Sequence, residues 1–93
     1  MEYFVRYGAG NETIDITIQL KKNTSVSSKY LFVPPLDDVS RGRTYGDPKF
    51  GIEKSIFILT NKGHLFVVKS GEYAYIDIED EALYLNEKPD DIE

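Results

Sequence analysis

Apolar and polar residues alternate most regularly between residues 13 and 20. Every second residue there is apolar, namely Ile14, Ile16, Ile18 and Leu20. This is the period of a strand with one buried and one solvated face. The stretch EYFVRYG at 2–8 also alternates, and GAGN at 8–11 supplies turn residues. The sequence therefore predicts a hairpin of two strands in its first twenty residues.

Five further stretches have the composition of short strands. KYLFVPP at 29–35 is apolar and ends at two prolines, which cannot donate to a ladder. SIFILT at 55–60 and LFVVKS at 65–70 flank a turn in which Gly63 can take positive φ, so they predict a hairpin. YAYIDIE at 73–79 alternates again, and ALYLNE at 82–87 fits either a last strand or the start of a helix.

Six or seven short strands with almost no helix predict an all-β fold, a small antiparallel β-sandwich or open barrel with one long loop. The 93 residues suit a single domain, and their 41% hydrophobic content supports one modest core. We expect this domain to span residues 1–85. The acidic end at 86–93 is expected to be a frayed tail.

Charge is unevenly distributed along the chain. Residues 1–71 carry ten basic and seven acidic residues, a surplus of +3, whereas residues 72–93 carry one lysine and nine acids, a net charge of −8. The total of −5 disfavours general nucleic-acid binding, because an acidic chain repels phosphates at long range. The acidic end is typical of a solvated segment, with docking on a basic protein as the alternative.

The composition also limits the cellular location and the kinds of chemistry that we expect. Without cysteine there is neither a disulfide framework nor a thiolate zinc site, and no apolar window is long enough for a membrane span. His64 is the only histidine, and neither the serine-elbow, zinc-protease, phosphate-loop and dinucleotide motifs nor the EF-hand spacing occurs. These features predict a cytoplasmic, non-enzymatic protein with no cofactor, metal or membrane partner.

The stretch from Leu36 to Lys54 has neither period, apart from one helical turn at LDDVSR, and irregular segments of this length are usually functional or mobile. Within it, two arginines could grip a phosphate or carboxylate, and two aromatic rings could stack on a ligand. The candidate binding residues are Arg41, Arg43, Tyr45, Asp47, Lys49 and Phe50. In the alternative interpretation, Tyr45 and Phe50 pack inward, and the arginines pair with Asp37, Asp38 or Glu53.

An ordered set of short motifs resembles a known module. RYG at 6–8, IDIT at 14–17, GDPKFGIEKSIFI at 46–58 and SGEYAYI at 70–76 follow one another in the chain. Together they resemble a small β-domain of uncharacterised function at the C-terminus of some mitochondrial DnaJ-like proteins. Similar modules are attached to bacterial and giant-virus proteins, including glycosyltransferase-like ones. The resemblance covers residues 3–78 and implies an accessory β-sandwich module without enzymatic activity.

These observations predict a non-enzymatic binding module that contacts another protein, another domain or a second copy of itself. One alternative is a small-ligand or glycan binder that uses the 36–54 loop for an anionic molecule or a sugar. Another is an acidic inhibitor or immunity-type protein that docks on a basic partner. Tyr73, Tyr75 and Tyr84 lie near the acidic end and suit either a basic protein or a sugar, although cross-strand packing explains them equally well.

Overall fold

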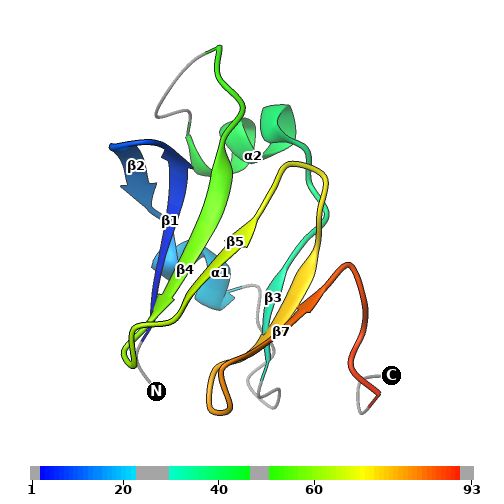
Figure 1. Cartoon of the computed structure of the whole chain (residues 1–93). Coiled ribbons are helices and arrows are strands. Elements are labelled where there is room, and N and C mark those ends of the chain that lie inside the picture. The colour runs from blue at the N-terminus through cyan, green and yellow to red at the C-terminus, as the bar shows by residue number, and fades with distance from the viewer. Residues whose placement is uncertain (1–2, 23–29, 47–50, 91–93) are drawn as a thin grey trace.

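The computed structural model of the chain describes residues 3–22, 30–46 and 51–90. These ranges contain seven strands and two helices (Figure 1). The strands are β1 (Tyr3–Ala9), β2 (Glu12–Asp15), β3 (Tyr30–Val33), β4 (Ser55–Thr60), β5 (Leu65–Val68), β6 (Ala74–Asp77) and β7 (Ala82–Leu85). The helices are α1 (Thr17–Lys22) and α2 (Asp38–Tyr45).

The strands form two antiparallel sheets, which confirms the predicted all-β fold. One sheet has the order β2-β1-β4-β5 and the other has the order β3-β6-β7. The predicted hairpins β1–β2 and β4–β5 are both present, with Tyr7 opposite Ile14 and Ile58 opposite Phe66. The segment at 82–87, which fitted a strand or a helix, forms strand β7 beside β6.

The core lies between the sheets because alternate residues of their strands point toward one another. The four-stranded sheet contributes Val5, Tyr7, Ile56, Ile58 and Val68, and the three-stranded sheet contributes Leu31, Val33, Ala74 and Ile76. Each of these side chains is at most 1% exposed. Fully burying a large apolar side chain stabilises the folded state by about 1.5–3 kcal/mol. Burial of this set therefore strongly stabilises the packing of one sheet on the other.

The prediction of a strand from 13 to 20 is wrong in its second half, because β2 ends at Asp15 and α1 begins at Thr17. The Asp15 carboxylate accepts hydrogen bonds from the Thr17 backbone N–H at 2.9 Å and from its hydroxyl at 2.6 Å, which turns the chain out of the strand. Ile16 and Leu20 then lie one helical turn apart and are both fully buried, while Ile18 is 68% exposed.

The segment 36–54 is more regular than predicted, since the single expected turn is a helix of eight residues. The Asp37 side chain caps α2 by accepting a hydrogen bond from the Ser40 backbone N–H at 2.8 Å. Gly46 ends the helix at φ 104°, and its N–H donates to the Gly42 carbonyl at 2.9 Å. A glycine inside the helix and the polar residues around it hide the helical period from the sequence.

Neither of the two helices in the described ranges is long and apolar enough to cross a membrane. Beyond Leu85 the chain continues against the fold rather than leaving it at once. The Asn86 N–H donates to the Tyr73 carbonyl at 2.8 Å, the Asn86 side-chain oxygen accepts from the Tyr73 N–H at 3.0 Å, and Pro89 is buried.

Candidate functional site

An open groove of about 630 Å³ lies between α2 and the segment that leads into β4. Its lining residues are Asp38, Val39, Gly42, Arg43, Gly51, Ile52, Glu53, Lys54 and Ser70. Two of its apolar side chains are unusually open to solvent, since Val39 is 65% and Ile52 47% exposed. The groove therefore offers apolar surface between charges of both signs.

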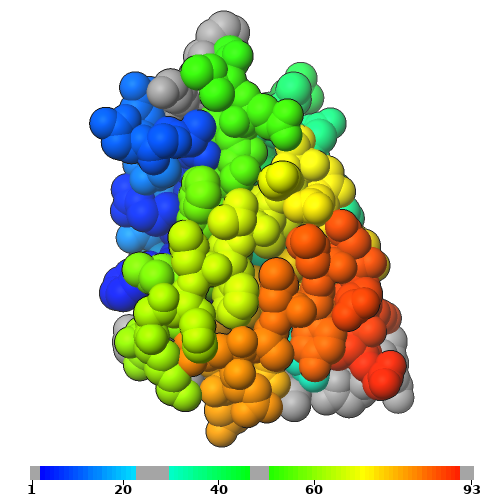
Figure 2. Space-filling view, in the orientation of Figure 1, coloured from blue at the N-terminus to red at the C-terminus, as the bar shows by residue number. Residues whose placement is uncertain are grey.

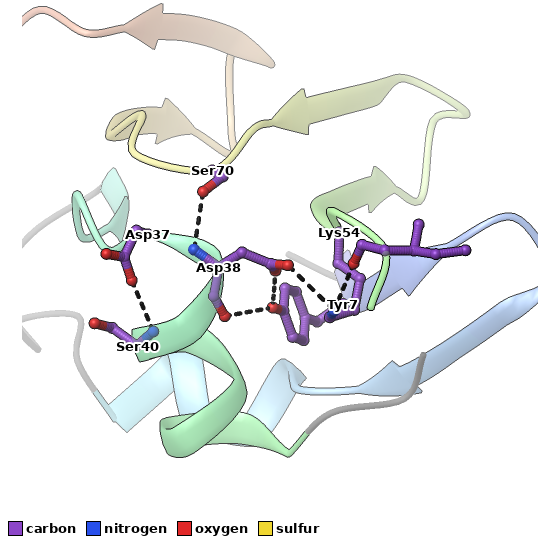
Figure 3. Close-up of polar contacts among 7 residues, drawn as sticks. Tyr7, Asp37, Asp38, Ser40, Lys54 and Ser70 are labelled. Atoms are coloured by element: carbon purple, nitrogen blue, oxygen red, sulfur yellow. Dashed lines mark hydrogen bonds and ion pairs between the residues drawn. The ribbon is translucent and has the colours of Figure 1, made fainter. Parts of the chain in front are cut away.

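Asp38 is the centre of a polar network that joins four parts of the fold (Figure 3). Its carboxylate accepts a hydrogen bond from the Tyr7 hydroxyl on β1 and lies 3.1 Å from the Lys54 ammonium nitrogen. Its backbone N–H donates to the Ser70 hydroxyl at 2.8 Å. Lys54 also donates to the Ile52 carbonyl at 2.6 Å. These contacts fix α2 relative to β1, to the segment that leads into β4 and to Ser70.

The charges in this network offset one another. Burial raises the pKa of Asp38, but the hydrogen bonds from Tyr7 and Lys54 together with the Lys54 charge outweigh it, so the pKa of this carboxyl lies below its usual value. The Lys54 side chain is 3% exposed and that of Asp38 is 21% exposed. Because this ion pair is already formed, Arg43 and Glu53 are the charged lining residues left to meet a ligand.

Arg41 does not line this groove, although the sequence suggested it as a ligand-gripping residue. It is fully buried, because the helix places it on the same face as Tyr45. Its guanidinium donates to three backbone carbonyls at the end of β5 and in the β5–β6 connection, those of Lys69 at 2.8 Å, Glu72 at 3.0 Å and Val68 at 3.4 Å. These bonds use the terminal Nη1 and Nη2 donors, and the Nε of Arg41 is buried without a hydrogen-bond partner among the described residues.

The other candidate binding residues are divided between the core, the groove and the part of the chain outside the described residues. Tyr45 is 8% exposed and packs edge-on against Tyr7, with ring centroids 5.9 Å apart. This agrees with the alternative interpretation, in which Tyr45 packs inward. Burial raises the pKa of Tyr45 and the nearby Arg41 lowers it, and burial prevails. Arg43 lines the groove and is exposed. Asp47, Lys49 and Phe50 lie outside the described residues.

A second polar cluster, which the sequence did not indicate, joins the β4–β5 turn to the β6–β7 turn. The Glu81 carboxylate lies 3.0 Å from His64 Nδ1 and accepts a hydrogen bond from the Thr60 hydroxyl. Lys62 Nζ is 3.9 Å from the same carboxylate. In a hydrolytic triad the imidazole stands between hydroxyl and acid, whereas here the carboxylate occupies the middle. Only the packing of the two sheets against each other brings Glu81 to Thr60 and His64.

The outward face of the four-stranded sheet carries a row of exposed apolar side chains. Phe4 on β1 is paired with Leu59 on β4, and Leu59 is paired with Leu65 on β5. These residues are 54%, 44% and 57% exposed, respectively. The next row on the same face holds the half-buried Phe57 and Val67. We call these five residues the β1–β4–β5 face.

The space-filling view shows this side of the molecule open to solvent. Atoms of residues 55–68, which include β4 and β5, stand on the front surface in yellow-green and yellow, beside the blue atoms of the N-terminal strands (Figure 2). Helix α1 contacts β1 and β3 instead, and its residue Leu20, together with Ile16 just before the helix, belongs to the core on the inner side.

Comparisons of this chain with protein-family models, with curated proteins and with solved structures find no match. Within the described residues, no three side chains of histidine, aspartate, glutamate or cysteine are placed to share a metal ion. The site must therefore be interpreted from its own geometry.

Proposed function

We propose that this protein is a non-enzymatic binding module that contacts another protein through the β1–β4–β5 face. The observation that carries the proposal is the direct pairing of Phe4, Leu59 and Leu65 across three neighbouring strands, each about half exposed. Contiguous exposed apolar side chains bounded by polar residues mark interaction surfaces, whereas isolated apolar side chains are common on any protein surface.

The expected strength follows from the exposed area. Complete burial of one such side chain is worth about 1.5–3 kcal/mol, so covering three that are about half exposed gains about 2–5 kcal/mol. Association itself costs about 4–15 kcal/mol. The row therefore anchors a partner but needs the neighbouring Phe57 and Val67 and further polar contacts to hold it. We expect a modest, reversible interaction.

Two features support the non-enzymatic part of this proposal. The Thr60–Glu81–His64 cluster lacks the order in which an imidazole activates a hydroxyl. The resemblance to β-domains attached to DnaJ-like and glycosyltransferase-like proteins favours an accessory role. A cytoplasmic location and a bacterial or viral origin are part of the same proposal and rest on the composition and this resemblance.

The test compares two serine variants that remove apolar surface in different places. Leu59→Ser combined with Leu65→Ser disrupts the β1–β4–β5 face, whereas Ile18→Ser removes an isoleucine that is 68% exposed on α1. Sedimentation velocity measures self-association, and affinity capture from the native host followed by titration of the purified partner measures hetero-association. The proposal expects an interaction that the double variant loses and Ile18→Ser keeps. An interaction that both keep equally would refute it.

The groove beside α2 favours a second candidate, the binding of a small anionic ligand or glycan. Its volume of about 630 Å³ falls within the usual range of ligand sites, about 300–1,000 Å³. Val39 and Ile52 offer apolar contacts, and Arg43 offers a forked donor. Thermal melts with inorganic phosphate, a dicarboxylate and short oligosaccharides test it. A stabilisation that Arg43→Ala removes supports the groove, and one that this variant keeps argues against it.

A further inference from the structure

Aromatic side chains form a row on the outward face of the three-stranded sheet. Phe32 on β3 is paired with Tyr75 on β6, and Tyr75 is paired with Tyr84 on β7. Their neighbours Leu31 and Ile76 point into the core, so the aromatic rings lie on the opposite face. Tyr73, two residues before Tyr75, extends the row. We call Phe32, Tyr73, Tyr75 and Tyr84 the aromatic face; all four are half-buried.

Three of the ring pairs at this face are close to perpendicular, whereas Phe32 and Tyr75 lie at 33° with their centroids 4.8 Å apart. Tyr73 stands at 90° to Tyr75 with centroids 6.3 Å apart, and the buried Tyr30 stands at 89° to Tyr75 and at 86° to Tyr84. A cationic side chain is attracted to each aromatic π-face that it meets, so rings set at several angles suit it.

Carboxylates border the aromatic face. Tyr84 lines a recess of about 370 Å³ together with Glu87, Lys88, Pro89 and Asp90. At the other end, Glu72 precedes Tyr73 and accepts a hydrogen bond from the Asn86 amide at 3.3 Å. Because residues 72–93 carry a net charge of −8, the field at this face attracts positive charge.

We infer that the aromatic face binds a lysine- or arginine-rich segment of a partner protein. The guanidinium of an arginine would stack against Tyr84 and pair with Glu87 or Asp90 in the recess, since this group combines a planar face with forked donors. The negative charge of residues 72–93 selects this occupant over a neutral glycan. The surface lies on the other sheet from the β1–β4–β5 face, so the two can bind separately.

Fluorescence anisotropy with the full chain tests this inference. The probes are labelled peptides of equal length in which glycine alternates with arginine, with serine or with glutamate. The arginine peptide should bind, and binding should weaken as salt rises, because exposed charges are screened beyond about 10 Å at 0.1 M. Binding of the serine peptide with equal affinity, or no binding of the arginine peptide at low salt, would overturn it.

Variants separate the contribution of the aromatic rings to peptide binding from the contribution of the net negative charge. Tyr84→Leu should lower the affinity for the arginine peptide about two- to fivefold, which is the effect of losing one exposed cation–π contact. Tyr84→Phe should bind the peptide with unchanged affinity. Phe4→Ser on the other sheet should leave the affinity for the arginine peptide unchanged, which distinguishes this surface from the β1–β4–β5 face of the proposed function. Unchanged affinity in Tyr84→Leu would mean that charge alone attracts the peptide and would overturn the inference.

A measurement on the unaltered protein covers the case in which Tyr84→Leu does not fold. In proton NMR spectra, the ring signals of Tyr84 and Tyr75 should shift as the arginine peptide is added and stay in place with the serine peptide. Ring signals that do not move while the peptide binds would place it elsewhere. A shift produced by a neutral oligosaccharide and not by the arginine peptide would identify a glycan as the occupant and contradict the inference.

Discussion

The Lys54 ammonium nitrogen lies 3.1 Å from the Asp38 carboxylate, at the base of the groove between α2 and β4. Asp38 comes from the one helical turn that the sequence indicated between Leu36 and Lys54, and Lys54 ends the part of that stretch without a period. Their ion pair is reinforced by the Tyr7 hydroxyl, which reaches the same carboxylate from β1. The groove is therefore built on a pair that belongs to the fold and not on charges held ready for a ligand.

Breaking this pair from one side should destabilise the protein. Asp38→Asn leaves the Lys54 charge, which is 3% exposed, without its carboxylate and should cost about 3 kcal/mol in the free energy of unfolding, the lower end for buried pairs. Urea denaturation measures it. The double variant Asp38→Asn with Lys54→Met should recover part of the loss, because the buried Lys54 charge is then removed as well. Equal losses in the single and double variants would contradict the coupling.

Two arginines on α2 should respond differently to the same substitution. Arg41→Ala removes the side chain that donates to three carbonyls at the end of β5 and in the β5–β6 connection, so it should lower the free energy of unfolding by about 2–4 kcal/mol. Arg43→Ala alters an exposed residue and should stay within about 0.5 kcal/mol of wild type. Thermal and urea melts of both compare them, and similar values would show that Arg41 does not hold the turn.

The contrast between these arginines shows what the sequence could and could not predict about the candidate site. The sequence suggested that both could grip a ligand or else pair with nearby acids, and it did not distinguish them, because a glycine-containing stretch without a period hides its helical register. The Asp37 cap and the Gly46 end do fit the helix signals, so the helix could have been found. The carbonyls that receive Arg41 come from residues 27 to 31 positions away, and no local pattern indicates them.

The two-sheet fold was predictable because six segments alternate or are β-rich between turn residues. Sequence alternation misled at residues 16–20, where Ile16 and Leu20 satisfy a helical spacing of four as well as a strand spacing of two. In SIFILT, four consecutive apolar residues indicate a strand but conceal which of its faces is exposed to solvent. Only the register with β1 and β5 shows that Leu59 joins Phe4 and Leu65 on the outside.

Alanine substitutions at Ile16, just before α1, and at Ile18 within it test this helical register directly. Ile16→Ala should cost about 2–4 kcal/mol in the free energy of unfolding, since it opens a cavity at a fully buried site. Ile18→Ala, at a position 68% exposed, should stay within about 0.5 kcal/mol of wild type. In a strand running from 13 to 20, both side chains would share one face and cost alike. Chemical denaturation of the two variants discriminates between these arrangements.

Acid should weaken the contact between the two hairpin turns. The hydrogen bond from Thr60, followed by contact with His64 and the charge of Lys62, holds the pKa of Glu81 below its usual value. A carboxyl whose pKa is lowered on folding contributes stability above its unfolded pKa, about 4.3. That contribution is lost as the pH falls through the folded value, because the unfolded chain then binds more protons.

Glu81→Gln should therefore be less stable than wild type at neutral pH, and the difference should shrink as the pH falls below about 4, where wild-type Glu81 becomes protonated. Thermal melts between neutral pH and about pH 3 measure the trend. Glu79→Gln, which also removes one negative charge but at an exposed position two residues earlier, controls for the change in net charge. A gap between Glu81→Gln and wild type that stays constant over this range would show that the Glu81 carboxylate does not join the two turns through its charge.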